Sequence, residues 1–360
     1  MNKIGFLQVT MIILSSVGLI NHVFIIPILL DRSGRDSWIS VILIAIPFVL
    51  WSSLFYFIMK KSGQQHLIEW IRSKYGRLAG YGVAVAASLY LFFAAAMTIQ
   101  DTLTWAVTSY LPNTPKVALM LFLVLLCYAA SVQGLRVIAI LAGILLPGIV
   151  ALGFFVMSSN MPNKDYTRLF PVLENGLAPV WKGMFICSCG LMELTVVLFM
   201  QHYLTRPIRF WQLALVALML VGLTLGPVMG GIAEFGTAEV TKLRYPAFEE
   251  WKLVVLLRNV ERLDFLSIYQ WLAGAFLRIT TSMFLLQEML NHRRKVPVVR
   301  FLLPFYILLG IISLLPVSDV VFYRFLSSIY LPGNLILLAA LTILLALLAL
   351  RIRTRRTTRA

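Results

Sequence analysis

Charged residues are scarce in this 360-residue chain, and acidic residues are the scarcest. Only 13% of the residues are charged, with 15 Asp and Glu against 31 Lys and Arg, whereas 60% are hydrophobic. An ordinary soluble domain carries roughly 25% charged residues, so this class is excluded. The formal charge of +16 does not indicate a nucleic-acid surface, because the basic residues lie in separate short loops and in the segment 351–360. We predict an all-α integral membrane protein.

Cysteines and catalytic motifs are also few. Cys127, Cys187 and Cys189 lie in apolar runs, and their odd number gives no disulfide framework. The last two would suit a soft metal ion, but thiolates need further ligands and none is near in sequence. The sequence contains no phosphate loop, nucleotide fingerprint, nucleophile elbow or His-rich metal motif. We therefore expect no metal, no cofactor and no enzyme, and an intramembrane enzyme is the least favoured function.

Long apolar runs dominate the rest of the chain. A helix needs about 20 apolar residues to cross a bilayer core of roughly 30 Å. Ten runs qualify, at about 4–30, 38–59, 78–111, 117–132, 135–157, 180–203, 210–233, 265–290, 296–316 and 321–350. The first run is too long for the core of a cleavable signal and lacks a small-residue cleavage site. We predict one membrane domain over 1–360 that ends in a basic cytoplasmic tail, 351–360.

The distribution of charge predicts the orientation. Lys and Arg favour the loops that follow the even-numbered segments, and Glu69 is the only acidic residue in those loops. Basic loops remain in the cytoplasm, so both termini are predicted to be cytoplasmic.

Three connections have distinct compositions. The segment 61–77 places His66, Ile68 and Trp70 among charges, which predicts a short amphipathic helix on the cytoplasmic surface. The outer segment 235–264 is mixed in charge, and its part 244–264 is predicted to form a helical hairpin over the outer mouth. The segment 158–179 is rich in Pro, Asn and Gly, so we expect it to be irregular.

Small residues occur in the middle of the first and sixth apolar runs. They are Ser15, Ser16, Val17 and Gly18 in the first, and Cys187, Ser188, Cys189 and Gly190 in the sixth. Interrupted helices at corresponding positions of two halves are typical of transporter-type binding sites. We therefore predict a 5+5 inverted repeat, about 4–157 and about 180–350, with discontinuous helices 1 and 6. Backbone groups freed by the breaks would suit the carboxylate and ammonium of an amino acid. Alternatively, the small residues only let two helices pack closely.

Glu193 is the most informative single residue. A charged side chain at the centre of a membrane helix costs about 2.5–3.5 kcal/mol on insertion scales, so it must be paired, protonated or directed to the interior. Glu193 is therefore either a proton or substrate-ammonium site, or one half of a structural ion pair, with Arg278 as the candidate partner.

Two helix faces carry further candidates. Tyr90, Met97 and Asp101 share one face of the third segment, because 100° per residue brings them close to one line. The eighth segment has a similar stripe, formed by Tyr269, Phe276, Thr280 and Gln287. Each stripe either lines a cavity or packs against a neighbouring helix, and packing is preferred for Met97 and Phe276. Tyr90, Asp101 and Thr280 are retained as candidate substrate-binding residues.

The residues also resemble a known family. The opening FLQVTMIILSSVGLINHVFIIP (6–27), followed by GRDSWISVIL (34–43), resembles the start of the endospore germination permeases, the B subunits of spore germinant receptors. YLPNTP (110–115), LFP (169–171), RYPAFE (244–249) and ERLDFLSIYQW (261–271) also resemble that family. The resemblance extends over essentially the whole chain, and the last two blocks are its most specific part.

The resemblance implies a fold, a location and partners. It implies ten helices of the amino acid–polyamine–organocation superfamily, with the inverted-repeat fold of sodium-coupled amino-acid carriers. It also implies residence in the inner membrane of a bacterial spore, beside an A-type membrane subunit and a C-type lipoprotein subunit. On this reading, an amino acid, or sometimes a sugar or nucleoside, binds at mid-membrane between segments one, three, six and eight and triggers germination. The alternative is a proton-coupled amino-acid transporter that uses Glu193 or Asp101.

Overall fold

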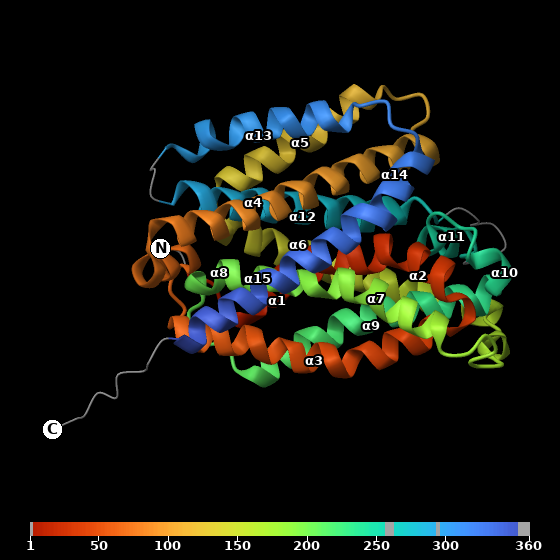
Figure 1. Cartoon of the computed structure of the whole chain (residues 1–360). Coiled ribbons are helices and arrows are strands. Elements are labelled where there is room, and N and C mark those ends of the chain that lie inside the picture. Colours follow the sequence, from red (N-terminus) through yellow and green to blue (C-terminus); the bar gives the residue numbers. More distant parts are fainter. Residues whose placement is uncertain (1–2, 256–262, 293–295, 352–360) are drawn as a thin grey trace.

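The computed structural model describes residues 3–255, 263–292 and 296–351 of the chain. Within these residues the regular elements are helices, most of them roughly aligned along one long bundle (Figure 1). The one extended pairing in this part of the chain is an isolated bridge between Ile4 and Leu204.

The first half of the chain contains six named helices. They are α1 (Phe6–Leu19), α2 (Ile25–Ser33), α3 (Ser37–Ser62), α4 (Leu67–Ser109), α5 (Lys116–Val132) and α6 (Leu135–Ser159). A π-helical turn, Ile20–Phe24, joins α1 to α2 without a gap.

The second half begins with a row of short helical pieces. This row runs through α7 (Ala178–Leu191), a 3-10 turn (Met192–Thr195), α8 (Val196–Met200) and a second 3-10 turn (Gln201–Tyr203). Next come α9 (Phe210–Phe235), α10 (Thr237–Val240), α11 (Pro246–Lys252), α12 (Leu266–Asn291) and α13 (Val298–Ser313). The last row is α14 (Asp319–Phe325), a π-helical turn (Leu326–Tyr330) and α15 (Leu331–Arg351).

Several of these helices are long and apolar enough to cross a membrane. In the described residues, six stretches meet that criterion: Phe6–Ser62, Leu67–Ser109, Leu135–Ser159, Ala178–Tyr203, Phe210–Phe235 and Asp319–Arg351. Two shorter apolar helices, α5 and α13, accompany them. Such an all-helical architecture fits a multi-pass membrane protein, as the composition predicts.

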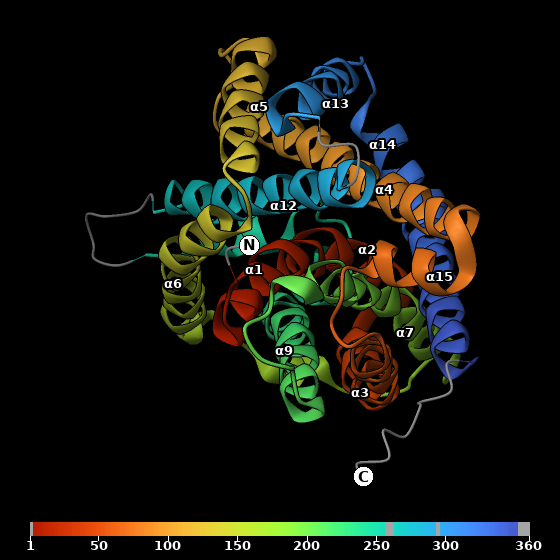
Figure 2. The ribbon, with the colours of Figure 1, turned by 90° about the vertical axis from the view of Figure 1, so that its left-hand side faces the viewer.

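Helix α12 lies at the centre of the bundle, in contact with α1, α4, α5 and α6 (Figure 2). It carries Arg278, Gln287 and Glu288, and all three are buried. Charged and amide side chains are costly against lipid, so this helix is surrounded by protein. Outer helices such as α3, α6 and α15 instead expose large apolar side chains, including Ile46, Ile144 and Ile336.

The two ends of the bundle differ. Helix α1 begins and α15 finishes at one end, here called the termini end, whereas α10 and α11 lie at the opposite, loop end (Figure 1). The irregular segment predicted before α7 contains only the 3-10 turns Met161–Asn163 and Tyr166–Leu169. The predicted outer hairpin contains α11, and its residues 256–262 lie outside the described residues.

The predicted amphipathic helix exists, but its apolar face packs into the protein. Gly76, with φ of 87°, separates it from the long part of α4. His66, Ile68 and Trp70 are all buried within the molecule. A helix is therefore present in this segment, as predicted, whereas the bend at Gly76 and the burial were not predicted and follow from packing against the termini end of the bundle.

Candidate functional site

The predicted helix interruptions need a correction. Ser15, Ser16, Val17 and Gly18 lie inside the continuous helix α1, and the departure from α geometry comes later, at the π-helical turn Ile20–Phe24. In the sixth segment the four small residues likewise belong to α7, and the geometry changes at Met192–Thr195. Small residues weaken a helix, but hydrogen bonds and packing decide where it departs from regularity. Glu193 therefore lies in the irregular turn itself.

Glu193 forms a two-point ion pair with Arg278 of α12. The Arg278 Nη1 donates to Glu193 Oε2 at 2.5 Å, and Nη2 donates to Oε1 at 2.9 Å. Both side chains are almost completely buried. Glu193 is therefore paired, and its partner is the one that the sequence suggested. Paired guanidinium and carboxylate groups match in shape as well as charge, so the pair holds α12 against the 3-10 turn.

Two further contacts fix the guanidinium. Arg278 Nη1 also donates to the backbone oxygen of Ser16 at 3.0 Å, and Nε donates to Thr98 Oγ1 at 2.9 Å. Tyr90 of α4 lies beside Glu193. Segments one, three, six and eight therefore meet at one point, as the predicted binding region requires.

A second close contact joins the first and sixth segments one turn before Glu193. Gly190 faces Asn21 and Ile25, and a Cβ on Gly190 would lie 2.5 Å from Asn21 Oδ1 and 2.7 Å from Ile25 Cγ1. The Asn21 amide donates to the Val17 backbone oxygen at 2.9 Å, while its own Oδ1 is buried without a partner in the described structure. Gly190 thus permits a close approach that any side chain would block.

The other predicted residues of helices 1 and 6 are buried or half-buried. The Ser15 hydroxyl has no hydrogen-bond partner among the described residues. Ser188 Oγ donates to the Met184 backbone oxygen and Cys189 Sγ to that of Phe185, which are contacts within their own helix. Cys187 is buried in the apolar core.

Thr280 does not join the central site. It lies two residues after Arg278, which is about 200° around an α-helix. Its side chain lies beside Cys127 of α5, and its backbone oxygen accepts a hydrogen bond from Ser131. The face of α12 that carries Thr280 therefore packs on α5, and the predicted role of Thr280 in the pocket has no support in this arrangement.

Asp101 lies at the loop end, apart from Glu193, in a cluster here called the outer clamp. Arg244, between α10 and α11, donates from Nη2 to Asp101 Oδ1 at 2.6 Å and from Nε to Asp319 Oδ2 at 3.2 Å. Tyr245 OH also donates to Asp101 Oδ1, at 3.3 Å. Burial disfavours the charged guanidinium, but Asp101, Tyr245 and Asp319 raise the pKa of Arg244 above its usual value. One arginine therefore ties the connection between α10 and α11 to α4 and α14.

We expect Arg244→Gln to loosen the connection that carries α10 and α11. The substitution leaves Asp101 buried beside a neutral amide, which is unfavourable in a low-dielectric setting. Backbone hydrogen exchange in α10 and α11 should accelerate by at least about tenfold, because local opening no longer has to break this ion pair. Mass spectrometry of the purified protein would measure it.

Lys252→Gln provides the matched control. The Lys252–Glu249 pair, at 2.8 Å, is partly solvent-exposed, with 48% and 29% of the two side chains accessible, and surface pairs contribute about 0–1 kcal/mol. Exchange should change less than about twofold in the control. Equal exchange rates in wild type and Arg244→Gln would contradict the outer clamp.

Sequence reasoning missed several residues of these two clusters. Thr98 lies next to the face that contains Tyr90 and Asp101, yet a threonine in an apolar run gives no distinctive signal. Tyr330, close to Arg278 and Glu193, comes from the π-helical turn of the last segment. Arg244 belongs to the RYPAFE block, so the resemblance pointed to its segment, but nothing in the sequence indicated a contact with Asp101.

The fold and the central ion pair define a multi-pass membrane protein with a charged site enclosed by helices. The family model described as "Spore germination protein" matches residues 3–319. The chain belongs to this family of spore germination proteins.

Three curated relatives agree with this assignment. Spore germination protein XB of Bacillus anthracis is 41% identical over 342 residues, which cover 95% of this chain and 96% of the relative. Spore germination protein KB of Bacillus subtilis (strain 168) is 22% identical and covers 71% of this chain and 69% of its own length. Spore germination protein A2 of the same organism is 23% identical and covers 67% of each.

Proposed function

We propose that this chain is the nutrient-sensing membrane subunit of a spore germinant receptor. The ten predicted segments would cross the membrane as two inverted halves, with the termini end in the cytoplasm. The meeting of segments one, three, six and eight at Glu193 and Arg278 supports a mid-membrane site. The family assignment supports a role in germination, and from the resemblance we propose assembly with an A-type membrane subunit and a C-type lipoprotein in the inner spore membrane.

The central ion pair suggests how an amino acid would be recognised. A free amino acid carries one carboxylate and one ammonium, which are the counterparts of Arg278 and Glu193. Binding would exchange one internal ion pair for two ligand pairs, the carboxylate on Arg278 and the ammonium on Glu193. Without the ligand, the pair holds α12 to the irregular turn, so the exchange would release this connection. A ligand shifts a conformational equilibrium only by binding one state better than the other. Here the ligand would bind better to the state in which Glu193 and Arg278 are apart, because only that state offers both charges to it.

The same contacts bear on the alternative of a proton-coupled transporter. That mechanism needs a buried carboxyl group that gains and loses a proton. Glu193 and Asp101 are both paired with arginine at 2.9 Å or less, so either carboxylate would have to give up its ion pair in order to carry a proton. We therefore favour the receptor over proton coupling.

Spores that lack this chain should lose the response to one set of nutrients. We expect the loss to be complete for that set and absent for other nutrients, because the proposed subunit confers ligand specificity. Release of spore ions and the fall in optical density, over a panel of amino acids, sugars and nucleosides, would measure the response. Complementation with the wild-type gene should restore it.

Uptake into vesicles separates the receptor from a carrier. Purified protein in proteoliposomes should accumulate no nutrient above empty vesicles. Accumulation of a nutrient driven by a proton gradient, together with unchanged germination of the deletion strain, would contradict the receptor function and favour the transporter.

A further inference from the structure

Three of the four histidines in the sequence gather around Glu288 at the termini end of the bundle. His66 precedes α4, His202 lies in the 3-10 turn that ends the sixth segment, and His292 follows α12. Glu288 lies one helical turn before His292. This group, here called the histidine cluster, comes from three separate parts of the chain.

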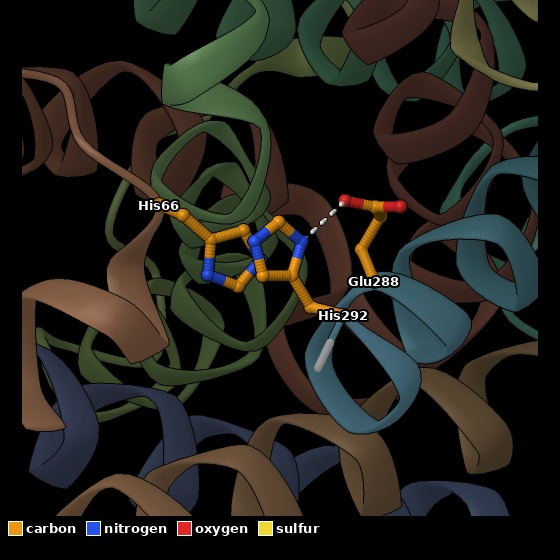
Figure 3. Close-up of side chains that lie close together, drawn as sticks. All are labelled: His66, Glu288 and His292. Atoms are coloured by element: carbon orange, nitrogen blue, oxygen red, sulfur yellow. Dashed lines mark ion pairs between the residues drawn. The ribbon is translucent and has the colours of Figure 1, made fainter. Parts of the chain in front are cut away.

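Three members of the cluster, His66, Glu288 and His292, bring their nitrogen and oxygen atoms close enough to share a metal ion. Glu288 Oε2 lies 3.4 Å from His202 Nε2 and 3.7 Å from His292 Nδ1. Ligands about 2.0–2.1 Å from a tetrahedral zinc ion are roughly 3.4 Å apart. One ligand atom from each of His66, Glu288 and His292 also lies within 4.8 Å of the others. Figure 3 shows the His292 ring directed toward the Glu288 carboxylate.

His66 supplies a second, independent observation. Its side chain is only 7% exposed, and neither ring nitrogen has a hydrogen-bond partner in the described structure. Buried imidazole nitrogens without partners are unusual. The ring stacks on His292 with centroids 3.9 Å apart (Figure 3), so a turn about its side-chain bonds would direct a nitrogen to a shared ion.

The histidine cluster also lies beside a pocket. A pocket of about 90 Å³ borders His66 and His292 and is lined further by Glu69, Arg72 and Tyr81. The His292 side chain is 31% exposed. The cluster therefore borders both this pocket and, through His292, the surface of the protein.

We propose that the histidine cluster binds a divalent transition-metal ion of the zinc type, with His66, Glu288 and His292 as ligands and His202 holding the Glu288 carboxylate in place. Imidazole and one carboxylate suit zinc and its first-row neighbours, whereas Mg²⁺ and Ca²⁺ prefer oxygen ligands. The bound ion ties α12 to the connection before α4 and, through His202, to the end of the sixth segment. Movement of these elements apart would break metal–ligand bonds, so the ion holds the termini end closed.

Metal binding is tested on purified full-length protein, without nutrient or partner subunits. We expect about one Zn²⁺ per chain by calorimetry and elemental analysis, and a rise in the thermal midpoint that Mg²⁺ does not produce. His202→Gln combined with His292→Gln should weaken binding by at least about 100-fold, since even indirect partners of a metal site contribute about 10–100-fold. His22→Gln should bind as wild type does, because His22 contacts the Leu223 backbone oxygen of α9, apart from the cluster.

Each outcome is decisive for the site. Wild-type protein that binds no Zn²⁺ and gains no thermal stability would overturn the proposal, whether or not the double variant folds. Binding that His22→Gln removes, or that the double variant retains, would overturn the ligand assignment.

The closing role rests on the proposed receptor function and has its own test. Zn²⁺ should slow the nutrient response of spores with the wild-type chain and have less effect with His202→Gln. If the protein binds zinc but Zn²⁺ affects wild-type and His202→Gln spores equally, the closing role is contradicted and the proposal of a metal site still stands.

Discussion

Glu193→Gln and Arg278→Gln should each strongly destabilise the protein and abolish the nutrient response. Either change leaves one buried charge without its partner, which costs about 3–5 kcal/mol and lowers the thermal midpoint in detergent by about 5–10 °C. The double variant Glu193→Gln with Arg278→Gln should recover most of the stability, because no uncompensated charge remains. It should nevertheless fail to respond to an amino acid, since the groups complementary to the ligand are gone. Thermal unfolding and spore ion release would measure the two effects separately.

The double variant separates a structural role from a functional one. Lys242→Gln is the control for loss of a charge, because the Lys242–Glu239 pair is more than 60% exposed on both sides and should contribute little. A double variant that is stable and responds normally would show that the pair is structural only. Single variants as stable as wild type would contradict the buried ion pair.

Gly190→Ala should abolish the response, whereas Gly18→Ala should be mild. A Cβ at Gly190 would meet Asn21 Oδ1 at 2.5 Å and Ile25 Cγ1 at 2.7 Å. Neither atom can easily withdraw, because the Asn21 amide is bonded to the Val17 oxygen and Ile25 is fully buried. The sixth segment must therefore shift away from the first, which displaces Glu193 one turn further on. Nutrient-triggered ion release and the thermal midpoint would both report the shift.

Two glycines provide matched controls for this substitution. The nearest atom to a Cβ on Gly18 is Leu223 Cδ1 at 3.1 Å, the tip of a flexible side chain. Gly222, inside α9, has no heavy atom within 4 Å of an added Cβ, and Ala in a helix interior is favoured over Gly by about 1 kcal/mol. Gly222→Ala should therefore be neutral or slightly stabilising. A Gly190→Ala protein as active as Gly222→Ala would contradict the close contact.

The sequence predicted the central site in part. Glu193 stood out because a carboxylate is costly in an apolar run, and Arg278 was the candidate partner for the same reason. The small residues before Glu193 were predicted to break the helix, but they remain helical, and only Gly190 has the close approach that a glycine requires. Whether a small residue breaks a helix or lets another helix approach depends on what faces it.

The histidine cluster shows the limit of motif reasoning. Metal motifs are recognised in sequence when ligands recur at short spacing, as Glu288 and His292 do over one helical turn. His202 is separated from Glu288 by 86 positions, and His66 is more distant still. The expectation of no metal followed from the missing motif, whereas the side chains meet only because three elements end at the same place.

The sequence by itself determined the all-helical membrane class and the family resemblance. These properties depend on local composition and on contiguous blocks of residues, since membrane insertion responds to the hydrophobicity of each run. Tertiary structure alone decided that Asp101 meets Arg244, that Thr280 turns toward α5, and that Glu193 and Arg278 close on each other between helices. Each of these contacts depends on how one helix is rotated against the next. The apolar pattern of a single helix is compatible with many rotations, and only the packing of all the helices together selects one.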